Sequence, residues 1–210
     1  MKFAMLTIAL ALAGCASQPA PPSWQPNAKD ALDGFTDDYL RGNTAAANAE
    51  FARARRETSS TGRADLVAQV ELVRCATRAA ALEFEDCPGF AALATDANAR
   101  QRAYAAYLAG RWEGLDVAAL PEQHRAVVGS GSLAGLADPL SKLVAAGALF
   151  RAGRIKPAEI EAATETASAQ GWRRPLLMWL GVQAQRAEAA GNVAAVEQIK
   201  RRIALASGTK

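Results

Sequence analysis

The sequence predicts an all-α protein, and three observations support this prediction. Alanine supplies 51 of the 210 residues and dominates the chain together with Leu, Glu, Gln and Arg, which are good helix formers. From Ala28 onward, β-branched residues are scattered and no segment alternates for long as a strand would. Helix start and stop signals recur along the chain. We therefore expect antiparallel helical hairpins, stacked as a solenoid or packed as an irregular bundle.

Composition excludes several classes of protein. Half of the residues are hydrophobic, which is too many for a chain that is disordered throughout. Three cysteines do not make a disulfide scaffold, and one histidine cannot form a His-rich metal site. The net charge of +3 is too small to indicate nucleic-acid binding. We expect no nucleic-acid partner, no metal and no cofactor.

The first residues have the features of an export signal. Lys2 precedes an apolar run over residues 3–13, which is about half the roughly 20 residues that a membrane-spanning helix needs. The motif Leu12-Ala13-Gly14-Cys15 resembles the lipobox of bacterial lipoproteins. The resemblance implies that residues 1–14 are a signal peptide and that Cys15 becomes the lipid-carrying first residue.

The same resemblance predicts where the protein resides. Ala16 follows the cysteine, whereas an Asp at that position marks retention at the inner membrane in enterobacteria. We therefore expect a lipid anchor in the outer membrane through acylated Cys15, with the domain facing the periplasm.

A proline-rich tether is expected over residues 15–27. Pro19, Pro21, Pro22 and Pro26 oppose a helix and favour extended chain. Trp24 lies within this segment, and it either docks at an interface or packs on the first helix of the domain.

The folded domain is expected to span residues 28–210. Asn43, Asp138 and Asn192 are suitable helix N-caps, and Pro157 and Pro175 suit a first helical turn. The glycine-rich stretch near 129–137 is a candidate joint between two lobes. The predicted helices are 28–41, 44–57, 63–83, 88–94, 97–110, 115–128, 138–152, 157–169, 175–190 and 193–206.

Four predicted helix ends share a glycine, which points to a repeat. These glycines are Gly42, Gly110, Gly153 and Gly191, and the first two are 68 residues apart, twice the tetratricopeptide period. After Gly42 the small and aromatic residues of the second helix fall where that family places them (Ala47, Phe51, Ala54). The array resembles a degenerate tetratricopeptide-like solenoid, and the alternative is a non-repetitive bundle.

Apolar stripes at helical spacing are expected to form the core. One cluster, Trp172, Leu176, Met178 and Trp179, leaves two interpretations open. It is either part of the core or a hydrophobic groove that receives a partner helix or peptide. The stripes are Leu66, Val67, Val70 and Val73, and Leu140, Leu143, Val144 and Leu149.

Cys75 and Cys87 are expected to pair in an oxidising periplasm. A continuous helix between them would separate their Cα atoms by about 18 Å, whereas a disulfide needs about 7 Å or less. The chain must therefore turn back around residues 79–86, which shortens the predicted helix 63–83. The alternative is two buried free thiols.

Catalytic constellations are missing, and we expect no enzyme. His124 is the only histidine, and no nucleophile elbow surrounds the neighbouring serines, so a surface position is expected for it. The carboxylates Glu83, Glu85 and Asp86 suit a solvated turn better than a glycosidase pair. A Ser-His-Asp site would have to draw on Ser130, Ser132, Asp116 and Asp138.

Three basic clusters occur, at Arg53-Arg55-Arg56, Arg173-Arg174 and Lys200-Arg201-Arg202. They are either helix-end charges or contacts for anionic lipid and acidic partners.

Together these features predict a non-catalytic scaffold or assembly factor for an envelope machine, with other envelope proteins as partners. The alternatives are an enzyme, or the activator of one, acting on peptidoglycan, and a lipid-binding lipoprotein.

Overall fold

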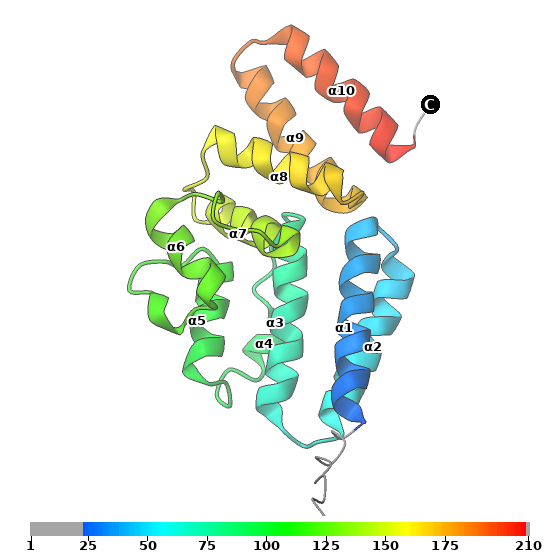
Figure 1. Cartoon of the computed structure of the whole chain (residues 1–210), viewed down its shortest axis with the longest axis vertical. Coiled ribbons are helices and arrows are strands. Elements are labelled where there is room, and N and C mark those ends of the chain that lie inside the picture. The colour runs from blue at the N-terminus through cyan, green and yellow to red at the C-terminus, as the bar shows by residue number, and fades with distance from the viewer. Residues whose placement is uncertain (1–22, 209–210) are drawn as a thin grey trace, which may run out of the picture.

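The all-α prediction is confirmed. The computed structural model describes residues 23–208, and this range contains ten α-helices, one 3-10 helix and no β-strand (Figure 1). None of its helices is long and apolar enough to cross a membrane. The elements are α1 (Trp24–Arg41), α2 (Thr44–Ser59), α3 (Ala64–Ala80), α4 (Pro88–Ala91), α5 (Ala99–Leu108), η1 (Val117–Ala119), α6 (Glu122–Ser130), α7 (Pro139–Arg151), α8 (Pro157–Ala169), α9 (Arg173–Ala189) and α10 (Val193–Ser207).

The first helix begins earlier than expected. α1 starts at Trp24, so residues 24–27 are helical and the predicted extended tether is wrong for them. Pro26 is the third residue of α1, where a proline costs no intrahelical hydrogen bond because the first amides have no partner. Trp24 is half-buried. The remainder of the tether lies outside the described residues.

The predicted helix ends are confirmed at all four glycines. Gly42, Gly110, Gly153 and Gly191 have φ of 94°, 70°, 67° and 68°, the left-handed conformation that ends a helix. At the other ends, the Asp138 carboxylate accepts from the Ser141 amide at 2.7 Å, and the Asn192 side chain accepts from the Ala195 amide at 3.1 Å.

Two predicted helix starts differ in detail. The side chain of Asn43 does not cap α2, because its amide donates to the Asp38 carboxylate instead. α9 begins at Arg173, so Pro175 is its third residue and not its first.

The long helix α3 lies at the centre of the array and packs against α2, α5 and α7 (Figure 1). α7 crosses the end of α3 at very close range. A Cβ added to Gly147 would lie 2.1 Å from the carbonyl oxygen of Ala79. This approach explains part of the alanine content, because only small side chains let two helix backbones come so near.

The predicted joint near 129–137 does not divide the molecule into two lobes. α6 continues through Gly129 and Ser130, and Leu133 and Leu136 beyond it are buried. The amide of Leu133 donates to the Glu159 carboxylate of α8 at 2.9 Å. One hydrophobic core extends from α1 to α9 and includes residues on both sides of this stretch.

Candidate functional site

Cys75 and Cys87 form a disulfide with a Cα–Cα distance of 5.8 Å, as predicted. The chain turns back where the pairing requires it. α3 ends at Ala80, and Leu82 adopts a left-handed φ of 57°. The amide of Glu83 then donates to the carbonyl oxygen of Arg78. The predicted helix 63–83 is therefore shortened to 64–80.

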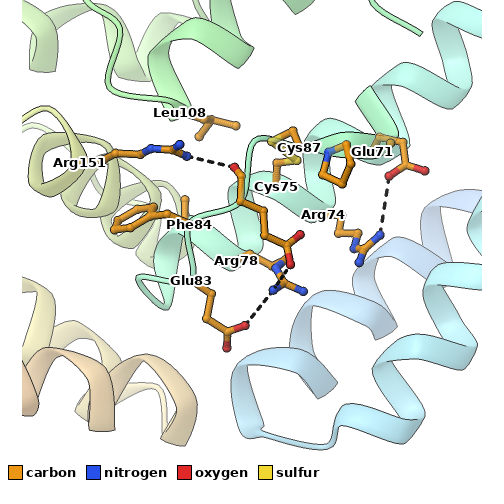
Figure 2. A pocket seen from close by; sticks show the side chains of 13 residues that line it. Glu71, Arg74, Cys75, Arg78, Glu83, Phe84, Cys87, Leu108 and Arg151 are labelled. Atoms are coloured by element: carbon orange, nitrogen blue, oxygen red, sulfur yellow. Dashed lines mark hydrogen bonds and ion pairs between the residues drawn. A yellow bond between two sulfur atoms is a disulfide. The ribbon is translucent and has the colours of Figure 1, made fainter. Parts of the chain in front are cut away.

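The acidic turn beside the disulfide is exposed at Glu85 and Asp86, as expected, and arginines also hold it. Figure 2 shows Arg78, Glu83 and Arg151 of this region from close by. Glu83 and Glu85 contact the Arg78 guanidinium at 3.2 and 2.5 Å. Asp86 contacts Arg151 at 2.9 Å. These arginines come from α3 and α7, so the turn is fixed to two helices.

This cluster does not resemble a glycosidase site. A glycosidase needs two carboxyl groups with room for a sugar between them. Here the pocket beside the disulfide has a volume of about 10 Å³, which is room for about one water molecule. Glu71 at its other end is buried and lies 2.9 Å from Arg55. The cluster therefore connects helices and leaves no space for a substrate.

A much larger cleft lies between α3, α5, α7 and the segment 119–125 around the start of α6. Its volume is about 590 Å³, which is sufficient for a peptide segment or a small molecule. α3 contributes Gln69, Val73 and Thr77, which are four residues apart and therefore share one helix face. This cleft is the candidate functional site.

Aromatic side chains form part of the lining of the cleft. His124 is 2% exposed, so the expectation of a surface histidine is wrong. Its ring lies 5.1 Å from the ring of Tyr107 and 5.7 Å from that of Tyr104. The Tyr107 hydroxyl and His124 Nδ1 are hydrogen-bonded at 3.3 Å. Burial lowers the pKa of His124 to about 4, and the imidazole is therefore neutral at pH 7.

The outer part of the lining carries polar side chains that have no intramolecular partner among the described residues. Gln69, Arg100, Glu122 and Gln123 are exposed, and Ser141 is half-buried. By contrast, Gln101 is fully used, because it completes the capping box of α5 and donates to the carbonyl oxygen of Asp65. The free side chains offer amide, hydroxyl and charged groups to a ligand above an apolar and aromatic surface.

Three of the residues that a Ser-His-Asp site would draw on make other hydrogen bonds. Ser130 donates to the carbonyl oxygen of Ala126, and Asp138 caps α7. Asp116 accepts from the Ala119 amide. Glu122 is the one carboxylate among the described lining residues of the cleft. The lining therefore offers neither a catalytic triad nor a carboxylate pair.

The predicted groove around Trp172 is not formed. Trp179 is fully buried and donates from Nε1 to the carbonyl oxygen of Ala80 at 3.2 Å. Trp172 and Leu176 pack against the same core, and only Met178 is exposed, at 41%. The core interpretation is correct because α9 lies across the end of α3, a contact that local sequence does not reveal.

The sequence analysis did not predict the cleft. Tyr104 and Tyr107, three residues apart on one helix, were a signal for an aromatic face. Cys15 lies outside the described residues. Within residues 23–208, no group of three His, Cys, Asp or Glu side chains is placed to hold a metal ion. Comparison with protein-family models, with curated proteins and with solved structures finds no significant match to this chain.

Proposed function

We propose that the chain is a lipid-anchored protein of the outer membrane that faces the periplasm. In this proposal it acts as a non-catalytic scaffold, and the cleft between α3, α5, α6 and α7 holds a segment of a partner envelope protein. The motif ending in Cys15 supports the anchor, and the cleft supports the scaffold.

One observation carries the scaffold proposal. The cleft combines free hydrogen-bonding side chains with an apolar and aromatic lining, and it does so without converging acid and base groups. Such a surface suits polypeptide, whose backbone amides alternate with side chains that bury apolar area. A glycosidase would need a second carboxylate beside Glu122, and an enclosed lipid site would not have Gln69, Arg100 and Gln123 in its lining.

Site-specific photo-crosslinking in intact cells tests the scaffold. A photoreactive residue is placed at Gln69 or at Gln123 in the cleft, and at Gln185 of α9 as the control. Gln185 is an equally exposed glutamine outside the cleft. We expect the same envelope protein to crosslink from positions 69 and 123 and not from 185. An even spread of abundant neighbours from all three positions would contradict the proposal.

Fractionation of Cys15→Ala tests the anchor separately. We expect the variant to leave the membrane fraction or to remain unprocessed, because lipid on this residue supplies the attachment. The matched control replaces Cys75 and Cys87 together and should stay with the membrane. Retention of Cys15→Ala in the outer membrane would refute the anchor without bearing on the cleft.

A further inference from the structure

The exposed hydrophobic side chains are concentrated at one end of the molecule. Within residues 23–208, the large hydrophobic residues that are exposed are Met178, Val193 and Leu205, and all three lie on α9 and α10. Val193 and Leu205 are 72% and 83% exposed. Such side chains at the open end of a helical array indicate a surface that meets a partner.

α10 has only one neighbour over most of its length. It packs on α9, and in Figure 1 it lies at the opposite end of the long axis from the start of α1. Val196 is its single buried residue. Ile199 and Ile203 are half-buried on the side that faces α9. Within the part of the chain that the structure describes, no helix packs on the opposite side of α10.

The uncovered side of α10 has a self-complementary pattern. A helix turns by about 100° per residue, so six residues of α10 point away from the Ile199 side. They form three pairs, and the two members of each pair lie equally far before and after position 199. The pairs combine two apolar residues, two alanines, and one acid with one base. They are Val193 with Leu205, Ala194 with Ala204, and Glu197 with Arg201.

We infer that this face, which we call the outer α10 face, binds a second copy of the chain through an antiparallel pairing of α10 with α10. A two-fold axis near position 199 places Val193 of each copy at the same height as Leu205 of the other, at opposite edges of the contact. It also places each Glu197 against the other copy's Arg201, which gives two opposite-charge contacts. A two-fold interface requires this kind of self-matching surface, because the same patch must fit itself.

Five of the six side chains on the outer α10 face are exposed, and Ala204 is half-buried. Arg201 is exposed and makes no ion pair with another residue of the described range 23–208. Glu197 is bound only to Lys200, at 3.4 Å, and both of these side chains are more than half exposed. Ala194 and Ala204 leave the two helices free to approach to about 8 Å, the short end of the usual range of helix packing distances.

A membrane surface fits α10 less well than a second copy does. The basic run Lys200-Arg201-Arg202 does not form one face, because Arg202 turns toward α8 and contacts Glu165 at 2.9 Å. Among the described residues, Arg201 is therefore the one cation of this run that makes no ion pair, and it lies beside an acid and two apolar residues. An anionic lipid headgroup bound to Arg201 would lie close to the Glu197 carboxylate, which carries the same negative charge.

The pairing leaves the cleft open, since α10 is not among its lining elements. A single helix pair is a small interface, below the roughly 1,200 Å² of standard complexes, so we expect a dimer of moderate affinity. This inference does not depend on the proposed function, because self-association can occur whether or not the cleft binds a partner.

Sedimentation equilibrium of the full chain in a mild, density-matched detergent tests the inference. We expect a concentration-dependent monomer–dimer equilibrium. Glu197→Arg and Arg201→Glu each place like charges in both symmetric contacts and should raise the Kd roughly tenfold or more. The double variant restores opposite charges and should return the Kd to within a few-fold of the original value.

A matched control separates this surface from a general charge effect. Arg186 of α9 is exposed and has no ion pair, so Arg186→Glu changes the charge equally outside the outer α10 face and should leave the Kd unchanged. A chain that stays monomeric to roughly millimolar concentration would overturn the inference. A dimer that is indifferent to both single reversals would overturn it as well. Binding of the monomer to anionic phospholipid vesicles through Arg201 would assign the face to lipid instead.

Discussion

Arg174 Nε donates a hydrogen bond of 2.7 Å to the carbonyl oxygen of Tyr39, although the two residues are 135 positions apart in the chain. The same guanidinium donates to the Thr44 hydroxyl at 2.7 Å and to the Glu83 carboxylate at 3.0 Å. It also lies over the Tyr39 ring, 4.2 Å from the centroid. One side chain of α9 therefore connects the end of α1, the start of α2 and the acidic turn, and it closes the array of helices.

Replacing Arg174 by lysine tests this closure. Lysine keeps the charge but cannot reproduce the planar set of donors, so it cannot serve the Tyr39 carbonyl, the Thr44 hydroxyl and Glu83 together. We expect the free energy of unfolding to fall by roughly 2 kcal/mol in denaturant titrations. The control Arg186→Lys, on the exposed side of the same helix, should change it by less than about 0.5 kcal/mol. Equal values for the two variants would show that Arg174 contributes no more than a surface charge.

The disulfide is expected to stabilise the fold measurably. Replacing both Cys75 and Cys87 by alanine frees a short loop of the unfolded chain, and we expect a loss of about 3 kcal/mol in the free energy of unfolding. The unaltered protein treated with reductant should behave like the double variant. If reductant leaves its stability unchanged, the two thiols are not paired in the protein, and alkylation followed by intact-mass measurement would show this directly.

Two helical glycines provide opposite predictions for the same substitution. Gly147→Ala places a methyl group against the backbone carbonyl of Ala79, which neither helix can avoid, so we expect a loss of more than about 3 kcal/mol. Gly181→Ala meets no atom within 4 Å, and we expect a gain of roughly 0.5–1 kcal/mol from helix propensity. Thermal unfolding followed by circular dichroism distinguishes them. Tolerance of alanine at 147 would mean that α3 and α7 lie farther apart.

His124 makes stability depend on pH in a defined direction. Burial lowers its pKa to about 4 from the ordinary 6.5, so between these values the unfolded chain binds a proton that the folded chain does not. The contribution is complete above about pH 6.5 and is lost progressively as the pH falls to about 4, by roughly 3 kcal/mol in total.

Denaturant titrations at several pH values check this dependence against His124→Gln. The glutamine can still accept from Tyr107 but does not titrate, so its stability should fall less steeply between pH 6.5 and 4. Since His124 is the only histidine, no other side chain has an ordinary pKa near 6.5. Parallel pH curves for the two proteins would show that the imidazole is accessible to solvent.

The helices themselves were predictable because their signals are local. Asp138 followed by a proline predicts the start of α7, and a left-handed glycine predicts its end, without any knowledge of the neighbouring helices. The pairing of Cys75 with Cys87 was predicted from the expected oxidising compartment. The turn that it requires was predicted because a continuous helix would hold the two Cα atoms too far apart.

The surroundings of each helix depended on contacts between residues that are distant in the chain. His124 is buried because α5 brings two tyrosines beside it, and Trp179 is core because α9 returns to the end of α3. The candidate cleft likewise exists only where four elements meet. Local capping and helix propensity act within a few residues and therefore determined the all-α class and many helix ends, whereas the predicted helix 115–128 is the 3-10 helix η1 followed by the separate helix α6. Burial, the cleft and the free outer face of α10 were decided by tertiary packing, because which face of a helix is covered depends on a partner that its own sequence does not specify.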